Sequence, residues 1–181
     1  RAAMPVPNEG LALGIGGYLS DHVYAVAGFA DANSDPHRPS DAFESFFEQR
    51  EYFKHVEIGS IRSREDTWLN NAHLTFWQVD ERTEAGVEGG WGANLSWSRL
   101  FADRWTTFVR AGYASDGGSI LQKSLSAGFA VRNTPGGNQL GLGLNWGEVN
   151  ESTYGKGLRD QYTAELYYRI QFWEDLAITP D

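Results

Sequence analysis

Residues 139–146 read Gln-Leu-Gly-Leu-Gly-Leu-Asn-Trp, and their strict alternation decides the fold class. A large apolar side chain occupies every second position, and glycine or asparagine occupies the positions between. A period of two is the pattern of a β-strand with one apolar and one polar face. The same alternation runs through four further segments, residues 91–98, 105–114, 123–132 and 161–171.

Weaker alternation extends this pattern over most of the chain. It marks residues 11–19, 23–32, 55–62 and 71–79, and a tenth segment begins at Leu176. Short and long connections alternate between these segments, which is typical of an antiparallel up-and-down barrel with tight turns at one rim and loops at the other. The sequence therefore predicts an all-β barrel domain over residues 10–181.

Two segments fall outside the predicted strands. Residues 1–9 include two prolines and are predicted to be a linker. A long loop is expected at residues 34–53, with one short helix at residues 41–49 that Ser40 can cap.

Composition narrows the class of protein further. The 21 glycines and the 14% aromatic content favour tightly curved strands. No apolar run approaches the roughly 20 residues that a membrane helix needs, whereas strands of a transmembrane barrel need only alternate. A net charge of −9 with scattered Lys and Arg argues against a nucleic-acid partner. The absence of cysteine excludes a thiolate metal site.

Aromatic residues lie near the ends of the apolar face in several of these segments. Tyr and Trp favour the membrane–water interface because each has an apolar body and a polar tip. The pattern therefore predicts a barrel that crosses a lipid bilayer. The expected interface aromatics are Trp91, Trp97, Trp105, Tyr113, Trp146, Tyr162, Tyr168 and Trp173.

Several stretches, in order, resemble the carbohydrate-selective porin family of the OprB type. They are Ala-Gly-Phe-Ala-Asp-Ala-Asn (27–33), His-Val-Glu-Ile-Gly (55–59), Leu-Asn-Asn-Ala-His-Leu-Thr-Phe-Trp (69–77), Val-Asp-Glu-Arg (79–82), Leu-Gly-Leu-Asn-Trp-Gly (142–147), Asp-Gln-Tyr-Thr-Ala-Glu-Leu-Tyr-Tyr-Arg (160–169) and Leu-Ala-Ile-Thr-Pro-Asp (176–181). The resemblance covers most of the chain.

The resemblance implies a barrel of about 16 strands that lets sugars such as monosaccharides diffuse across the outer membrane of a Gram-negative bacterium, with no cofactor and no enzymatic activity. With nine to ten strands, the chain is expected to be the C-terminal part of such a barrel, without its first strands and its last. The polar face would then line the lumen, where mixed donors and acceptors suit neutral polyols and aromatic rings can stack on sugars. The expected lumen residues are Glu57, His73, Trp77, Asn94, Arg110, Arg132, Asn145, Glu165, Tyr167 and Arg169.

Two other functions stay open on the residues alone. The strands could form a soluble or surface barrel that binds a small ligand. Less readily, the chain could be an outer-membrane barrel hydrolase, in which His73 would work with Ser60 or Ser96.

A calcium loop is the one metal site that the sequence suggests. Asp31, Asn33 and Asp35 have the spacing of the first ligands of such a loop. The sixth position is Pro36 instead of glycine, and the twelfth is Ala42, which offers no side-chain oxygen. The sequence therefore predicts an acidic, solvated loop and no metal ion.

Overall fold

The computed structural model describes residues 3–35, 37–133, 137–173 and 176–180, which form one antiparallel sheet of ten strands. All ten expected strands are present, and the all-β prediction is confirmed. Their bounds are β1 (Ala12–Tyr18), β2 (Val23–Asp31), β3 (Tyr52–Ile61), β4 (Asn71–Val79), β5 (Gly90–Phe101), β6 (Trp105–Asp116), β7 (Leu121–Asn133), β8 (Asn138–Val149), β9 (Gln161–Trp173) and β10 (Leu176–Ile178).

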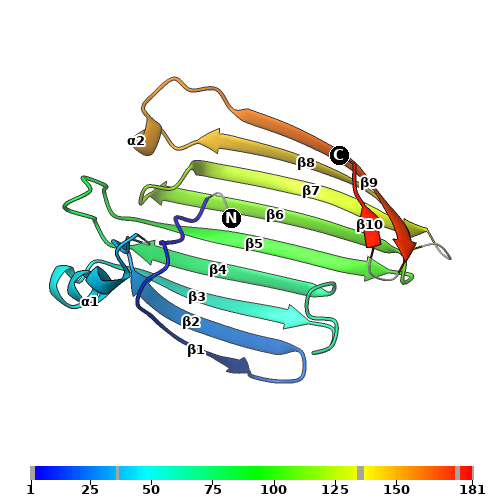
Figure 1. Ribbon diagram of the computed structural model, residues 1–181, viewed down its shortest axis with the longest axis horizontal. Coiled ribbons are helices and arrows are strands. Elements are labelled where there is room, and N and C mark those ends of the chain that lie inside the picture. Colours follow the sequence, from blue (N-terminus) through cyan, green and yellow to red (C-terminus); the bar gives the residue numbers. More distant parts are fainter. Residues whose placement is uncertain (1–2, 36, 134–136, 174–175, 181) are drawn as a thin grey trace.

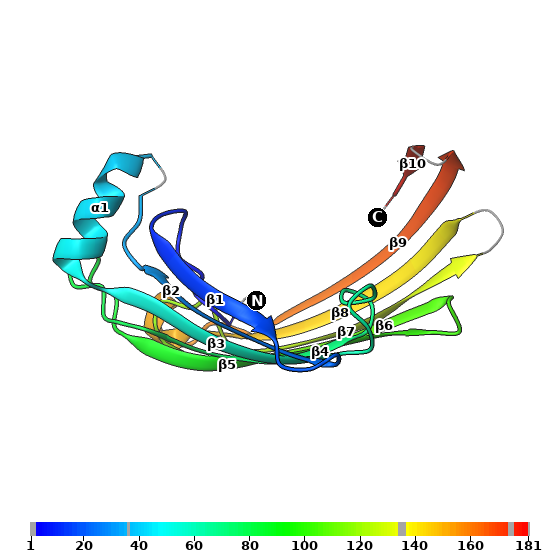
Figure 2. The same cartoon turned by 90° about the horizontal axis from the view of Figure 1, so that it is seen from below.

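Each strand pairs with the next along the chain, so the order in the sheet is the order in the sequence (Figure 1). The up-and-down prediction is therefore confirmed for the described residues. The sheet is open, with β1 and β10 at its two edges. It is also curved, and the N-terminal segment crosses its concave face (Figure 2).

The strand register sorts the side chains into two unlike faces. Leu144 of β8, for example, lies opposite Ala127 on β7 and Ala164 on β9, whereas the next residue, Asn145, lies opposite Ser126 and Thr163. The apolar set occupies the convex face, and the polar set occupies the concave face. A slip of one residue in any pair would exchange the two sets, so the alternation itself fixes the register.

The two ends of the sheet differ in their connections. Residues 32–51, 80–89, 117–120 and 150–160 connect strands at one end, which we call the long-loop rim. Residues 19–22, 62–70 and 102–104 connect them at the other, the short-turn rim. The connection between the strands expected at 105–114 and 123–132 is only a tight turn, because β6 and β7 extend beyond these predicted ends. Gly117 and Gly118 adopt positive φ in this turn, which glycine does without strain.

The expected helix is present but longer and less regular. A 3₁₀ turn η1 (Pro39–Asp41), α1 (Ala42–Glu44) and a π-helical turn η2 (Ser45–Gln49) follow one another without a break. We call residues 39–49 the loop helix. Ser40 is not its cap, because its hydroxyl donates to Asp41 instead. A second short helix, α2 (Glu151–Tyr154), was not predicted, and Asn150 caps it by accepting from the Ser152 amide. In the described ranges, no helix is long and apolar enough to cross a membrane.

Candidate functional site: the concave face

The concave face carries a row of polar residues across the middle of the sheet, with one glycine among them. Its members lie directly opposite one another from strand to strand. The row runs through Tyr24, Gly59, His73, Ser96, Arg110, Ser126, Asn145 and Thr163. A second row beside it contains Glu57, Thr75, Asn94, Gly112 and Ser124. Eight strands thus contribute to one polar wall.

Glu57 is the centre of a hydrogen-bonded network in this wall. Its carboxylate accepts from the Tyr24 hydroxyl at 2.9 Å and from the Thr75 hydroxyl at 2.7 Å. His73 Nε2 lies 4.0 Å from Glu57 Oε2, and its Nδ1 lies 2.9 Å from Asn71 Oδ1. These bonds hold the carboxylate and the imidazole in fixed positions, with about a fifth to a quarter of each side chain exposed.

A shallow cavity of about 300 Å³ lies over this network. Its lining combines the Glu57 carboxylate, the His73 imidazole and the Arg110 guanidinium with amides and hydroxyls. Arg110 Cζ lies 5.3 Å from the centre of the Phe108 ring, and this cation–π contact stabilises the guanidinium group. On the next strands, the Ser126 hydroxyl pairs with Asn145 at 2.7 Å. The cavity therefore offers donors, acceptors and both signs of charge within one small area.

All ten expected lumen residues belong to the concave set by strand register. The structure groups Glu57, His73, Asn94, Arg110 and Asn145 around the shallow cavity. Arg132 and Arg169 lie apart from them, both opposite Gln139 near the short-turn rim. Glu165 and Tyr167 face glycines of β8.

Four aromatic rings of the concave face lie flat over a glycine of the neighbouring strand. The pairs are Tyr24 with Gly59, Trp77 with Gly92, Phe108 with Gly128 and Tyr167 with Gly141. In each pair, a Cβ on the glycine would lie 2.2–2.6 Å from the nearest ring atom. Glycine therefore lets these rings rest on the wall instead of standing out from it, a known device for glycines in sheets. This pairing accounts for part of the high glycine content.

Replacing Gly59 by alanine is expected to displace the Tyr24 ring and break its hydrogen bond to Glu57. Forcing a methyl group into such a contact should lower the free energy of unfolding by about 1–3 kcal/mol. Urea titration of the protein in detergent micelles would measure this loss. Gly17→Ala is the matched control, since an added Cβ at Gly17 meets nothing within 4 Å. Equal stability of the two variants would contradict the expectation.

The N-terminal segment, expected to be a linker, packs against the sheet over the described residues 3–8. We call these residues the inner strap. Ala3 is fully buried and packs with Met4 against Phe53, Trp77 and Val79 on the concave face. Asn8 Nδ2 donates to the Ser34 carbonyl at 3.1 Å. The strap thus covers the concave wall near the long-loop rim.

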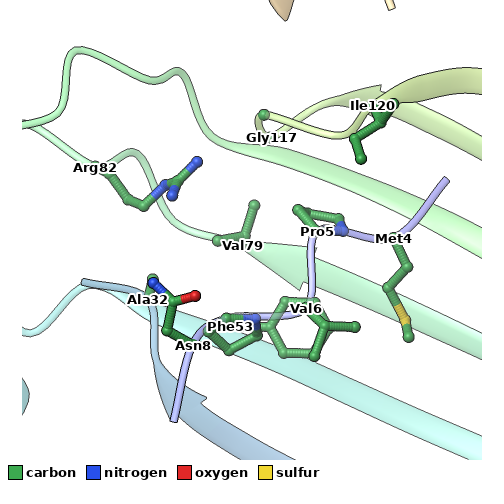
Figure 3. A pocket seen from close by; sticks show the side chains of 12 residues that line it. Met4, Pro5, Val6, Asn8, Ala32, Phe53, Val79, Arg82, Gly117 and Ile120 are labelled. Carbon is green, nitrogen blue, oxygen red and sulfur yellow. The ribbon is translucent and has the colours of Figure 1, made fainter. Parts of the chain in front are cut away.

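A second cavity, of about 420 Å³, lies between the inner strap and this rim (Figure 3). Phe53 and Val79 form part of its wall beside Pro5 and Val6, and Arg82 lies across it. The inner strap, which forms one side of this cavity, thus narrows the space above the polar wall.

The strap changes the role expected for Trp77. The side chain does belong to the concave set, but only 3% of it is exposed. Its ring stacks on Phe53, with centroids 6.3 Å apart and planes 22° apart, and Gly92 lies beneath it. Trp77 therefore presents no open ring face to a sugar. It anchors the strap.

The convex face is apolar and exposed even on strands in the middle of the sheet. Phe76, Leu95, Leu125 and Leu144 lie on four different inner strands, and between 47% and 54% of each residue is exposed. Apolar residues on the inner strands of a soluble sheet are normally covered, so this face lacks a covering partner in the described residues.

Seven of the eight expected interface aromatics occupy the convex face. Near the long-loop rim, Trp91 contacts Tyr113 with centroids 5.6 Å apart, and Trp146 lies opposite Tyr162. The remaining three lie nearer the short-turn rim and are Trp97, Trp105 and Tyr168. The exception is Trp173, which has the alternation of the concave face at the end of β9. Aromatic rings therefore flank the apolar band on both sides.

Asp31, Asn33 and Asp35, whose spacing resembles the start of a calcium loop, make hydrogen bonds within the protein. Asp31 is fully buried, and its carboxylate accepts from the Ser45 hydroxyl and from the Asn33 amide. Asp35 accepts from the amide of His37. Among the described residues, no three His, Cys, Asp or Glu side chains are arranged to hold a metal ion. Asp31 instead ties the loop helix to the end of β2, which corrects the expectation of a solvated acidic loop.

Two carboxylates at the long-loop rim are held in the charged form. Burial disfavours ionisation of Asp80, but hydrogen bonds from Lys54, Gln78 and the Tyr52 amide outweigh it and lower the pKa of Asp80. Burial also opposes ionisation of Glu51. Hydrogen bonds from Thr83 and Asn33 outweigh this effect of burial and lower the pKa of Glu51. These bonds connect β3 and β4 to the loops above them.

Acid is expected to weaken this rim. Because the folded-state pKa of Asp80 is lowered, its stabilising effect is complete above the ordinary value of about 4 and is lost as the pH falls through the folded-state pKa. Between pH 7 and pH 3, the free energy of unfolding should fall less for Asp80→Asn than for the wild type. The difference should be at most about 1 kcal/mol, because 47% of the Lys54 side chain is exposed and solvent screens the ion pair. Unfolding at the two pH values would measure this, with the exposed Glu88→Gln as the control.

Comparisons of the chain with protein-family models, with curated proteins and with solved structures each returned no match.

Proposed function

We propose that this sheet forms part of the wall of a β-barrel channel in the outer membrane of a Gram-negative bacterium, with lipid on its convex side and water on its concave side. The observation that carries the proposal is the distribution of side chains between the faces. The convex face is apolar across the inner strands, and the concave face holds the polar network of Glu57. In a bilayer, further strands would have to pair with the two open edges.

The alternative of a soluble ligand-binding barrel has less support. Such a barrel places its large apolar side chains inside, where they pack at the density of a core. Here the strand centres on the concave face carry Thr75, Asn94, Ser126 and Asn145. At the long-loop rim, where the concave face carries Phe53, Trp77 and Val79, the inner strap covers them.

The hydrolase alternative also has little geometric support. Ser60 lies opposite Ala72 and so belongs to the convex set, on the other side of the sheet from His73. Ser96 is the cross-strand neighbour of His73, but the imidazole is held by Asn71 and lies beside Glu57.

We further propose that the solute is a neutral carbohydrate. The shallow cavity pairs acceptors such as Glu57 with donors such as Arg110, and hydroxyls surround them. Sugars need both partners at once, and a wall of many exposed weak sites lets a solute bind and leave. The resemblance to carbohydrate-selective porins points in the same direction.

Reconstitution of the purified full-length protein into phosphatidylcholine bilayers tests the function. Discrete conductance steps are expected, and glucose or a maltose oligosaccharide should reduce them. Asn94→Trp, on the concave face, should lower the conductance, whereas Leu95→Trp, the adjacent residue on the convex face, should leave it unchanged. A protein that inserts into the bilayer yet passes neither ions nor sugar would rule the proposal out.

A further inference from the structure

The row of aromatic side chains at the long-loop rim of the convex face is interrupted at two strands. Phe29, Lys54, Gln78 and Trp91 lie directly opposite one another on β2 to β5. The two middle members of this row are polar. Lys54 Nζ and Gln78 Nε2 both reach towards the rim and donate to Asp80 at 2.8–2.9 Å. Lys54, Gln78 and Asp80 therefore form a polar cluster at the edge of the apolar band on the convex face.

The loop helix brings aromatic rings to this interruption. Phe46 packs on Phe29 and Tyr52, with ring centroids 5.6 Å and 5.2 Å apart. Phe47 contacts Phe46 at 5.0 Å. Figures 1 and 2 show the helix at the long-loop rim beyond β2 and β3. The helix is thus fixed to the convex side of the sheet at the level of Trp91.

Two rings of the loop helix are left uncovered. Phe43 is 64% exposed and Phe47 is 58% exposed. Glu44 and Glu48, each next to one of these rings in the chain, are also exposed. Ser45 bonds to buried Asp31 and holds the helix in this orientation. An amphipathic helix with a fixed aromatic side suits the boundary between lipid headgroups and acyl chains.

We infer that the loop helix is a membrane-interface anchor, whose Phe43, Phe46 and Phe47 enter a lipid surface and continue the aromatic row across β3 and β4. The inference rests on the proposed function, because it requires lipid on the convex face. Its occupant is the lipid surface itself, since the exposed rings of Phe43 and Phe47 continue the apolar convex band, and the exposed carboxylates of Glu44 and Glu48 beside them suit the layer of lipid headgroups.

Single spin labels can locate the helix relative to the lipid. The chain has no cysteine, so each variant carries one nitroxide. Phe47→Cys reports the anchor, Glu48→Cys is the matched control at the adjacent polar residue, and Leu144→Cys reports the convex face. In the full chain reconstituted in phosphatidylcholine vesicles, the ratio of oxygen to nickel-chelate accessibility is expected to be several times higher at position 47 than at position 48.

The possible outcomes separate the anchor from the membrane location. A label at 47 that is as accessible to the nickel chelate as the label at 48, with high oxygen accessibility at 144, would overturn the anchor and leave the proposed function standing. A label at 47 that neither reagent reaches would show a protein partner there and also overturn it. Aqueous accessibility at 144 would overturn the proposed function together with the anchor.

Discussion

Arginine in place of Leu144 is expected to destabilise the membrane-embedded protein by about 2–4 kcal/mol. Leu144 lies at the middle of β8 on the convex face and is 54% exposed in the isolated sheet. In the proposed orientation, a charge at this position would face the centre of the hydrocarbon layer, where neither water nor a counter-ion is available. Urea titration in phosphatidylcholine vesicles would measure the loss.

Asn145→Arg is the matched control for this substitution. The two residues are adjacent, but Asn145 faces the concave wall and pairs with Ser126. Loss of that one hydrogen bond should cost only about 1 kcal/mol, because water can solvate the new charge. The added cation should instead shift the ion selectivity of the proposed channel towards anions. Equal costs at the two positions would show that the faces are not divided between lipid and water.

The strands were predictable because their signal is local. In β8, the alternation of Leu140, Leu142 and Leu144 with glycines and Asn145 specifies both the strand and its two faces. The same alternation identified β4 with its ends unchanged. Loop lengths were less predictable, because β6 and β7 continue through Asp116 and Leu121, where polar and glycine residues suggest a loop.

The inner strap was missed because its partners are distant in the sequence. Two prolines exclude residues 3–8 from regular strand pairing, which is why the segment resembles a linker. A signal was nevertheless present on the strands. The concave positions near the long-loop rim include Phe53, Trp77 and Val79, which break the polar pattern set by Glu57 and Thr75. Large apolar residues at one end of a polar face indicate that something covers them.

Asp31 illustrates the same limit in a loop. Its spacing from Asn33 and Asp35 suggested a solvated or metal-binding loop, and its position beside the buried end of β2 gave no contrary indication. Its partner, Ser45, is 14 residues away, and only the folded loop helix brings the two together. Side-chain pairs of this kind depend on the loop conformation, which the sequence pattern did not specify.

Trp77→Ala is expected to have the largest effect on both stability and conductance. The side chain is almost completely buried between Phe53, Gly92 and the inner strap. Its removal leaves a large cavity and should cost about 3–5 kcal/mol. The strap then loses its anchor on the wall, so the proposed channel above the polar rows should widen and its single-channel conductance should rise.

The adjacent Phe76→Ala is the control, because Phe76 is 54% exposed on the convex face and would lie outside the proposed channel. It should leave the conductance unchanged and have a smaller effect on stability. If Trp77→Ala does not fold, Met4→Ala tests the same contact from the strap with less damage to the sheet. Unchanged conductance in a folded strap variant would mean that the strap does not limit the flow of ions, even though it covers the wall.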